Sequence, residues 1–505
     1  MASGILIPAG CAPTADPTRE IRISACLEIS FPGFPGDALF TDNDGQSAHA
    51  NERIQGVFLG LIGVIKMKRG KSKVSPRIVV VGGGAGGLEL VTRLGRKLGK
   101  RGLASVTLVD SSRTHIWKPL LHEVAAGTLD THDDEIEYLA QATENHFRFV
   151  LGSMDALDRK NRTIRIAPLR SARGELIVPE RIVPYDFLVM AVGSVCNDFG
   201  VPGAAQHCMF LDTTREAEDF QERLLGAYLR AQASGGAREG ELDVVIVGGG
   251  ATGIELSAQL HHAARLLNSY GLDNVKPSDI KIHIIESAPV LLGMLPPRLS
   301  AATLAQLNHL GIEVLLNTKV VEVLEEGVRT DEGKIIRASA KVWAAGVKAP
   351  DFLREIDGLE TNRINQLVVL PTLETTRDPE IYAIGDCCAC AWTEKGGNVP
   401  PRAQSAHQMA TTVYENLLRR MRNKKQKPFR YLDYGSLVSL GKYSTVGNLM
   451  GNLMGSVMIE GFIARLVYLS LYKMHQLALF GPFRLVLIVL SSFFRNRIQP
   501  RIKLH

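Results

Sequence analysis

One glycine pattern occurs twice in this chain, and each copy lies between a predicted strand and a predicted helix. The first copy reads RIVVVGGGAGGLEL and the second reads DVVIVGGGATGIEL. The pattern G-x-G-x-x-G falls on Gly82, Gly84 and Gly87, and again on Gly248, Gly250 and Gly253. The first glycine forms a tight turn, the second lets the backbone approach a pyrophosphate, and the third lets helix and strand pack closely. Two copies therefore predict an α/β protein with two Rossmann-like dinucleotide-binding domains.

An acidic residue ends the strand that follows each glycine pattern. Asp110 ends SVTLVD, and Glu286 ends IKIHIIE after a longer polar loop, SYGLDNVKPSD. A carboxylate about 20 residues beyond the glycines accepts from the ribose hydroxyls of a dinucleotide. Because it also repels a 2′-phosphate, NADH is favoured over NADPH. The structural alternative is a solvated acid at the end of a strand.

Sequence downstream indicates which domain takes which nucleotide. In two-nucleotide flavoproteins the flavin domain usually comes first, and the nicotinamide domain is inserted into it. The string YAIGDC places Gly385 and Asp386 after an apolar strand, where they suit a flavin ribityl or pyrophosphate group. Residues 185–194 and 341–350 are the predicted crossings between domains, and their small residues permit close backbone approach.

Charge and composition exclude some partners. The net charge is +6, with basic runs at 66–73, at 419–427 and at the C-terminus. These runs lack interleaved aromatic residues and a nucleic-acid reader motif, so no nucleic-acid partner is predicted. An anionic lipid surface suits them better. The length allows about two to four domains.

The chain has seven cysteines, an odd number in a long chain. This argues for free thiols and therefore for a reducing compartment. Cys387, Cys388 and Cys390 cluster, but no second set of ligands completes a metal site, so we interpret them as small residues beside a cofactor. No cysteine lies between Gly87 and Phe147. The redox pair of flavin disulfide reductases is therefore absent from its usual place, and so is support for sulfide oxidation. Electrons must leave the flavin for another acceptor.

The two ends of the chain differ in character. Residues 1–66 show no sustained periodicity, which predicts a disordered extension or a start assigned too early, with Met67 as the true start. From Ser456 the chain is strongly apolar, but Arg465, Lys473, Pro482 and Arg484 interrupt every span. Helical spacing joins Ile459, Phe462, Ile463, Val467, Leu471, Met474 and Leu477. We predict an amphipathic segment in the membrane interface followed by a shallow anchor, with a dimer interface or core helices as the alternative.

From about Met67 to its last residue, the chain resembles the bacterial type II NADH:quinone oxidoreductases, the single-subunit enzymes that do not pump protons. The most specific matching strings are HIWKPLLHEVAAG and RAQSAHQ. The resemblance implies non-covalent FAD, NADH as donor, and a membrane quinone such as ubiquinone as acceptor in a respiratory chain. It implies a peripheral enzyme on the cytoplasmic face of the bacterial inner membrane, and leaves a homodimer open.

The resemblance also implies site residues. The family motif A-Q-x-x-x-Q falls on Ala403 to Gln408, and Gln404 and Gln408 would share one helix face. Glu255 matches a family residue near the nicotinamide–quinone region, although a favourable helix dipole is a structural alternative and Glu89 stands in the same place after the first pattern. The residues expected to act in catalysis are Glu255, Gln404, His407 and Gln408.

The cofactor residues follow from the glycine patterns and the resemblance together. Those expected to bind FAD are Gly82, Gly83, Gly84, Ala85, Gly86, Gly87, Asp110, Lys118, Gly193, Gly385, Asp386, Ala403 and Gln404. Those expected to bind NADH are Gly248, Gly250, Gly253, Glu286, Ala345 and Gly346. No metal site is predicted.

These expectations define a domain plan. Residues 67–211 form the first part of the FAD domain, 212–342 the NADH domain, 343–430 the second part of the FAD domain with the quinone motif, and 431–505 the membrane-anchoring region. Two other functions remain open from the residues. One is an NADH-dependent flavin reductase with a soluble acceptor, and the other is an NADH-sensing flavoprotein.

Overall fold

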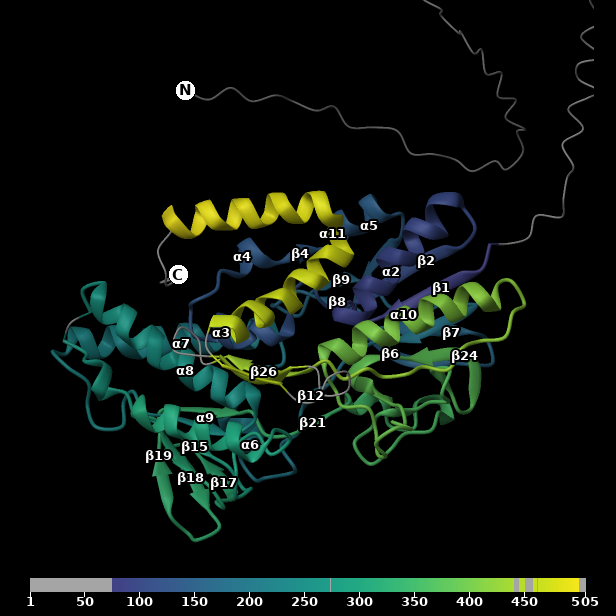
Figure 1. Cartoon of the computed structure of the whole chain (residues 1–505). Helices are drawn as coiled ribbons and strands as arrows, with labels where there is room; N and C mark the ends of the chain where they lie inside the picture. Colours follow the sequence, from purple (N-terminus) through teal and green to yellow (C-terminus); the bar gives the residue numbers. More distant parts are fainter. Residues whose placement is uncertain (1–74, 273, 440–444, 450–456, 461, 499–505) are drawn as a thin grey trace, which may run out of the picture. The chain divides into compact units, whose positions relative to one another are not determined.

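The computed structural model describes residues 75–272, 274–439, 445–449, 457–460 and 462–498 (Figure 1). The fold described below lies within one compact unit, residues 74–505. The predictions for residues 1–66 and for a start at Met67 lie outside the described residues.

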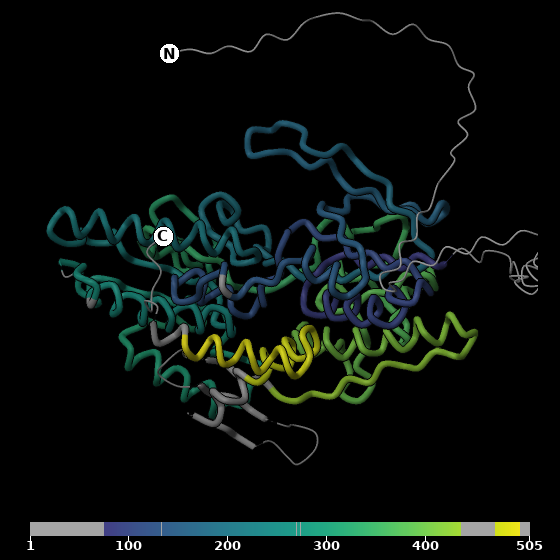
Figure 2. The backbone as a smooth tube through the Cα atoms, turned by 90° about the horizontal axis from the view of Figure 1, so that it is seen from above, coloured from purple at the N-terminus to yellow at the C-terminus, as the bar shows by residue number. Residues whose placement is uncertain are grey.

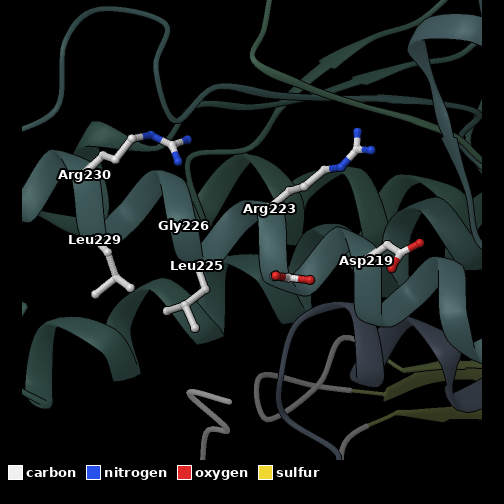
Figure 3. Close-up of a pocket in the computed structure, with 7 residues that line it drawn as sticks. Asp219, Arg223, Leu225, Gly226, Leu229 and Arg230 are labelled. Carbon is white, nitrogen blue, oxygen red and sulfur yellow. The ribbon is translucent and has the colours of Figure 1, made fainter.

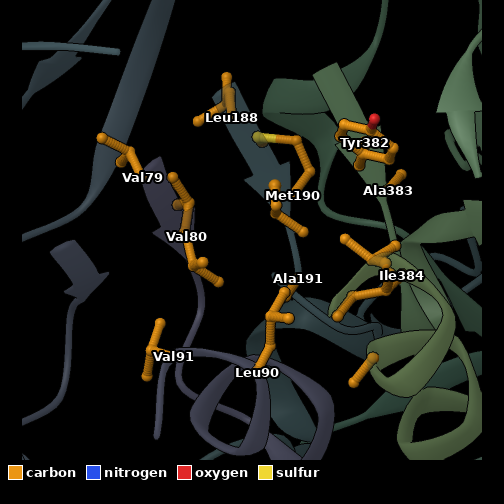
Figure 4. Packing of buried hydrophobic residues seen from close by; sticks show 14 of the residues in the cluster. Val79, Val80, Leu90, Val91, Leu188, Met190, Ala191, Tyr382, Ala383 and Ile384 are labelled. Atoms are coloured by element: carbon orange, nitrogen blue, oxygen red, sulfur yellow. The ribbon is translucent and has the colours of Figure 1, made fainter. Parts of the chain in front are cut away.

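A six-stranded sheet forms the first nucleotide-binding core, in the order β23-β24-β11-β1-β2-β5. Its strands are β1 (Arg77–Val81), β2 (Ser105–Asp110), β5 (Arg148–Leu151), β11 (Phe187–Met190), β23 (Glu374–Thr375) and β24 (Asp378–Ala383). Only β23 pairs antiparallel; the other neighbours are parallel. The run of valines in β1 is explained by its central place, because a parallel strand is covered on both faces. Figure 4 shows part of this core, including Val80, Leu188 and Met190.

Helices α2 (Ala85–Lys97), α5 (Tyr138–Asn145) and α10 (Ala403–Arg420) belong to this part of the unit (Figure 1). Helices α2 and α10 pack against each other very closely. A Cβ atom on Gly86 would lie 2.9 Å from the carbonyl oxygen of Ala406, so only glycine allows this contact. Smaller pairings accompany the sheet: β3 (Thr114–His115) with β4 (Ile136–Glu137), β6 (Met154–Asp158) with β7 (Thr163–Ile166) and β10 (Arg181–Pro184), β8 (Leu169–Arg170) with β9 (Leu176–Val178), and β22 (Leu367–Val368) with β25 (Cys388–Ala389).

A second, fully parallel sheet has the order β13-β20-β14-β15-β16. Its strands are β13 (Met209–Phe210), β14 (Val244–Val247), β15 (Ile282–Ile285), β16 (Glu313–Leu315) and β20 (Ala340–Trp343). With it lie α6 (Ala204–His207), α7 (Thr214–Ala233), α8 (Ala251–Ser269), α9 (Pro297–His309) and the antiparallel strands β17 (Val320–Leu324), β18 (Gly327–Thr330) and β19 (Ile335–Arg337). The fold is therefore the predicted α/β class with two parallel sheets.

The short strand β12 (Val195–Cys196) directly follows the first predicted crossing, residues 185–194, and β21 (Val347–Lys348) lies within the second, residues 341–350. They pair antiparallel, with Val195 opposite Lys348 and Cys196 opposite Val347. The chain thus leaves the first core and returns to it along one two-stranded ribbon.

The C-terminal part consists of β26 (Gly435–Ser439), β27 (Thr445–Leu449), β28 (Val457–Glu460) and the long helix α11 (Phe462–Ile498). By length and composition, Ser470–Phe494 could cross a membrane. However, α11 is broken at Gly481, where φ is 77°, just before Pro482 (Figures 1 and 2). The predicted interruption at Pro482 is therefore present as a bend between two helical arms.

Both arms of α11 carry exposed apolar side chains, which argues against the alternative of core helices. Leu471, Met474 and Leu477 of the predicted stripe are exposed on the first arm. On the second arm the exposed apolar residues are Phe483, Val486, Leu487, Val489, Leu490, Phe493 and Phe494. The side chains of Ile459, Phe462, Ile463 and Val467 lie outside the described part of the structure.

Candidate active site

The first glycine turn leaves room for a phosphate at the start of α2. Gly82 has φ of 101°, and a Cβ atom there would lie 2.3 Å from the carbonyl oxygen of Ala191. A Cβ atom on Gly84 would meet nothing within 4 Å, so the space beside the N-cap of α2 is open. Gly87 packs on Gly82, with its hypothetical Cβ 1.9 Å from the Gly82 oxygen. Open space and amides at a helix N-terminus together suit a pyrophosphate.

Asp110 closes this turn from the end of β2. The Gly83 N–H donates to Asp110 Oδ2 at 2.6 Å, and the Ser112 N–H donates to Oδ1 at 2.7 Å. Burial raises the pKa of Asp110, while these backbone hydrogen bonds oppose the shift. On the other side of the turn, Tyr138 donates its hydroxyl to the Gly83 oxygen at 2.8 Å. The predicted ribose carboxylate is therefore held in one orientation against the glycine turn.

The second glycine turn repeats this construction. The Gly249 N–H donates to Glu286 Oε2 at 2.7 Å, and the Ala288 N–H donates to Oε1 at 2.8 Å. A Cβ atom on Gly250 would again meet nothing within 4 Å, and Gly253 packs on Gly248 as Gly87 does on Gly82. Because of the longer loop, Glu286 lies farther along the sequence from its glycines than Asp110 does from its own. In space, however, Glu286 occupies the same place at its glycine turn.

The structure places Ala345 and Gly346 beside this second turn. A Cβ atom on Gly248 would lie 2.8 Å from the Ala345 nitrogen. Gly346 has φ of 65°, and its oxygen accepts from the Asn197 N–H at 3.3 Å. Both residues expected at the nicotinamide nucleotide therefore lie where β20 leaves the second sheet.

Two residues expected at FAD, Lys118 and Asp386, come from distant segments and are linked through Ser194. The Ser194 hydroxyl, next to Gly193, donates to Asp386 Oδ2 at 2.8 Å. Lys118 Nζ donates to the Ser194 carbonyl at 2.8 Å and pairs with Asp212 at 3.1 Å. Burial raises the pKa of Asp386, opposed by the Ser194 hydrogen bond and the Lys118 charge. Lys118, Ser194 and Asp386 thus form a chain of hydrogen bonds. It runs from the HIWKPLL string to Gly385–Cys387, which we call the GDC turn.

The A-Q-x-x-x-Q motif begins where the first glycine turn and the GDC turn meet. Ala406 touches both, since Cβ atoms on Gly86 and Gly385 would lie 2.9 Å from its oxygen and 3.3 Å from its Cβ. The Gly385 N–H also points to Met409 Sδ at 3.3 Å. Ala403 opens α10 at this junction. Three separate motifs predicted to contact the flavin are thus brought together.

Gln404 and Gln408 share one face of α10, and both amides bind the backbone of residues 432–435. Gln404 donates to the Gly435 oxygen at 2.9 Å and accepts from the Tyr434 N–H at 3.2 Å. Gln408 donates to the Leu432 oxygen at 2.8 Å and accepts from the Leu432 N–H at 2.9 Å. Each side-chain amide thus donates one hydrogen bond to the segment that leads into β26 and accepts one from it. Contact of either glutamine with a quinone stays a prediction.

His407 is paired with Glu89, a residue that sequence reasoning did not place in the site. His407 Nδ1 lies 2.5 Å from Glu89 Oε2, and the Glu89 side chain is 2% exposed. This hydrogen bond raises the pKa of His407. A signal for Glu89 was present in the sequence, because it stands two residues after the last glycine of the first pattern, as Glu255 does after the second.

Glu255 is 6% exposed and lies near His122 of the HIWKPLLHEVAAG string. His122 Nδ1 is 3.6 Å from Glu255 Oε2. Burial lowers the pKa of His122 to about 4, so this histidine is neutral at physiological pH. Helix α3 (Leu121–Ala125), which carries His122, packs on α7 and α8 and contributes to the second core. The HIWKPLLHEVAAG segment therefore contacts residues of both parts of the unit. Lys118 binds Ser194, beside the residues expected at FAD, and His122 lies near Glu255, beside the residues expected at NADH.

Cys387, Cys388 and Cys390 are buried and free, as interpreted from the sequence. Burial raises the pKa of Cys387 to about 12 and that of Cys390 to about 11, so neither forms a thiolate readily. Within the described residues, no group of three or more His, Cys, Asp or Glu side chains is placed to hold a metal ion.

A surface hollow of about 720 Å³ lies along α7 (Figure 3). It is lined by Asp219, Glu222, Arg223, Leu225, Gly226, Leu229 and Arg230. All of these come from one helix, and none is among the residues expected at a nucleotide or at the quinone. The hollow is therefore separate from the junction described above.

Known proteins share this sequence and fold. The family model described as pyridine nucleotide-disulphide oxidoreductase matches residues 76–410. The chain is 43% identical over 442 residues to a type II NADH:quinone oxidoreductase of Haemophilus influenzae, covering 85% of this chain and 99% of that protein. It is 29% identical over 422 residues to the type II NADH:quinone oxidoreductase NdhA of Mycobacterium tuberculosis, covering 80% and 86%.

Solved structures agree on the fold. The structure of NDH2 from Plasmodium falciparum in complex with NADH has a TM-score of 0.70 at 18% identity and covers 85% of this chain and 100% of that one. The sulfide:quinone oxidoreductase from Aquifex aeolicus has a TM-score of 0.63 at 16% identity, covering 84% and 96%. Together with the sequence matches, these findings show that the chain belongs to the pyridine nucleotide-disulphide oxidoreductases and, among them, to the type II NADH:quinone oxidoreductases.

Proposed function

We propose that this protein is a respiratory flavoenzyme that oxidises NADH through non-covalently bound FAD and reduces a membrane quinone without pumping protons. The observation that carries the proposal is the meeting of the first glycine turn, the GDC turn and the A-Q-x-x-x-Q motif around Ala406. A flavin placed by the first two would lie beside the third. FAD accepts a hydride from NADH and passes two electrons on; the protein supplies position and electrostatics.

The residues at the first turn fit an FAD. The open space at Gly84 and the N-terminus of α2 would hold the pyrophosphate, and Asp110 would accept from the ribose. Lys118, Gly193 and Asp386 would approach the remainder of the cofactor, because their hydrogen-bonded chain ends at the GDC turn.

The second turn fits NADH as the donor. Gly250 offers the same open space for a pyrophosphate, and Glu286 is fixed at the ribose position. The negative charge of Glu286 would repel the 2′-phosphate of NADPH. Ala345 and Gly346 present backbone without bulky side chains next to this turn.

Reduction of a quinone needs two protons as well as two electrons, and the hydride of NADH accounts for one of the protons. His407 and Glu255 are the residues we expect to move protons, since both are titratable, His407 lies in the A-Q-x-x-x-Q motif and Glu255 follows the second glycine turn. Gln404 and Gln408 would border the quinone headgroup from α10. In the described part of the chain, α11 is the one helix long and apolar enough for a membrane span, so no bundle of spanning helices would carry a proton path.

The exposed apolar residues of α11 support attachment to a membrane, and from the family resemblance we expect this to be a peripheral place on the cytoplasmic face of a bacterial inner membrane. The break at Gly481 suits a segment that dips into one leaflet, and the basic residues near the C-terminus suit anionic lipid. Quinones are dissolved in the bilayer, so an enzyme attached there meets its acceptor directly.

Anaerobic half-reactions test the proposal. Full-length protein is reduced with NADH, and the oxidised flavin absorbance is followed after a soluble ubiquinone analogue is added. We expect fast reoxidation by the quinone and slow reduction when NADPH replaces NADH. Reduction by NADH without quinone-dependent reoxidation would instead support a soluble acceptor or an NADH sensor.

A further inference from the structure

The pairing of Glu89 with His407 extends the proposed function and rests on it. We propose that Glu89 is a positioning residue for quinone reduction: its buried carboxylate holds the His407 ring by Nδ1 and keeps it charged, so that Nε2 donates a proton to the quinone oxygen.

The geometry fixes one side of the ring and leaves the other accessible. Glu89 Oε2 binds Nδ1 at 2.5 Å, while the His407 side chain is 38% exposed. Within the described residues, Nε2 has no hydrogen-bond partner. A carboxylate on one imidazole nitrogen sets the tautomer and orientation of the ring and stabilises its protonated form. The opposite nitrogen is then the one that donates.

The place of the ring is suited to the reaction. His407 lies between Gln404 and Gln408 in sequence and follows Ala406, which touches both flavin-side turns. The two glutamines are held by the backbone of residues 432–435, so this end of α10 is rigid. A proton donor fixed on a rigid helix beside the flavin site is positioned for a headgroup bound there.

Two further titratable groups lie near this pair, Arg93 and His475. On α2, Arg93 Nη1 lies 3.4 Å from Glu89 Oε1, donates to Thr411 Oγ1 at 2.7 Å, and its guanidinium lies 4.3 Å from the Tyr414 ring centre. On α11, His475 is buried, and burial holds its pKa well below the usual value. Glu89 raises the pKa of His407 and Arg93 opposes it, with the Glu89 hydrogen bond the larger effect. His475 stays neutral and adds no charge.

The chemistry balances with the reactants already named. NADH and one proton convert a quinone to a quinol and NAD⁺. In the step assigned to His407, the Nε2–H bond breaks and an O–H bond forms on the quinone; the electron pair of the broken bond stays on nitrogen. The ring then takes a proton from water, so neither Glu89 nor His407 is consumed.

Glu89→Gln tests the role, because it keeps the shape and an acceptor oxygen but removes the charge. Glu415→Gln is the matched control, since Glu415 is an exposed carboxylate on α10 paired with Lys427 at 2.9 Å. For each protein we would measure flavin content, the rate of flavin reduction by NADH, and the rate of reoxidation by a soluble ubiquinone analogue across pH. The pKa of His407 is read separately from ¹⁵N-histidine NMR spectra, with His407→Gln identifying its signal.

In Glu89→Gln we expect the pKa of His407 to fall by about one unit. The pH at which the rate of flavin reoxidation by quinone begins to decline, which we call the pH limb, should move to lower pH by the same amount. Above that limb, reoxidation slows on the order of 10-fold or more, which is at the low end for loss of a general acid. NADH reduction and flavin content stay as in the control. Glu89→Asp restores part of the pH limb, and the double variant with His407→Gln is no slower than His407→Gln alone, because both changes remove one device.

Other outcomes overturn the proposal. An unchanged pH profile in Glu89→Gln removes the positioning role, and equal losses of NADH reduction, flavin content and reoxidation show that Glu89 only holds α2 against α10. If wild-type flavin is reduced by NADH but is not reoxidised by quinone at any pH, the proposed function itself fails. That result is distinguishable, because it appears before any substitution is made.

Discussion

At the scale of single residues, each glycine turn is closed by one carboxylate that accepts a backbone N–H. Asp110 does so for Gly83 and Glu286 for Gly249, with nearly equal distances of 2.6 and 2.7 Å. The carboxylate therefore has two tasks, which are ordering the turn and presenting negative charge to the ribose. A substitution that keeps the first task and removes the second isolates the effect of charge on nucleotide choice.

Glu286→Gln comes nearest to such a substitution, because its amide oxygen still accepts from the Gly249 N–H, although the acceptor for the Ala288 N–H is lost. We expect the ratio of kcat/KM for NADPH to kcat/KM for NADH to rise on the order of 10-fold, since the repulsion of the 2′-phosphate is lost. Steady-state kinetics with both nucleotides measure it. Glu313→Gln, an exposed acid on neighbouring β16, serves as control. An unchanged ratio would mean that Glu286 only orders the turn.

At the scale of elements, α11 has one face on the protein and another exposed to its surroundings. Arg96 of α2 donates to the carbonyl oxygens of Ala478 and Leu479 just before the break, and Arg484 pairs with Glu144 just after it. His475 packs inside, with Nε2 at 3.1 Å from His115 Nε2 and its ring centre 4.6 Å from that of Trp117. The first arm is therefore docked, and the second presents its apolar side chains outward.

Phe483 is 75% exposed on the second arm, and we expect Phe483→Glu to weaken binding to vesicles of anionic lipid. Burying a phenyl ring contributes about 1.5–3 kcal/mol, so the partition coefficient should fall roughly 10-fold or more. Vesicle flotation measures it. Leu229→Glu makes the same kind of change on α7, where the residue is 51% exposed, and should leave vesicle binding as it was. Equal loss in both variants would point to charge alone.

Docking of α11 should also weaken in acid. Burial lowers the pKa of His115 to about 4 and that of His475 below its usual value of 6.5. Between those values the unfolded chain binds more protons than the folded one, so stability is present above the unfolded pKa and is lost as the pH falls. His115 should contribute roughly 1.4 kcal/mol per pH unit in that window, and His475 adds to the loss in the same direction.

Urea unfolding followed at about pH 5 and about pH 7.5 measures this pH effect. The urea concentration at the midpoint of unfolding should be lower at the acid pH, because the unfolded chain takes up protons that the buried histidines do not. His475→Gln removes one of the two groups and should make the difference between the two pH values smaller. A difference of the same size in the variant would show that the pair does not govern acid stability.

At the scale of the whole nucleotide-binding unit, residues 116–129 join the two cores. Lys118 contacts the flavin side through Ser194, while His122 meets Glu255 on α8. We expect Glu255→Gln to slow quinone reduction on the order of 10-fold and to alter its pH profile. Stopped-flow reoxidation measures it, and Glu222→Gln on the exposed face of α7 is the control. Unchanged quinone reduction at every pH would end the proton-transfer role of Glu255.

Much of this architecture could be predicted from local signals in the chain. The glycine turns, the strand-end acids Asp110 and Glu286, the GDC turn and the helix of the A-Q-x-x-x-Q motif each depend on a few consecutive residues, so their physical causes can be read locally. The break of α11 at Gly481 is of the same kind, because the following Pro482 lacks an N–H and clashes with the preceding turn.

Which of these segments meet was decided only by the tertiary structure. His407 and Glu89 lie 318 residues apart in sequence, and no local pattern measures that distance in space. No local pattern predicts the other long-range contacts either. These are the hydrogen bonds of Gln404 and Gln408 to the backbone of residues 432–435, the approach of His122 to Glu255, and the approach of His475 to His115. Local sequence determined the turns, helices and nucleotide-binding fingerprints through sterics and hydrogen bonding between near neighbours. The packing of α2, α10 and α11 determined the partners of the titratable side chains, because burial and long-range contacts exist only once the chain has folded.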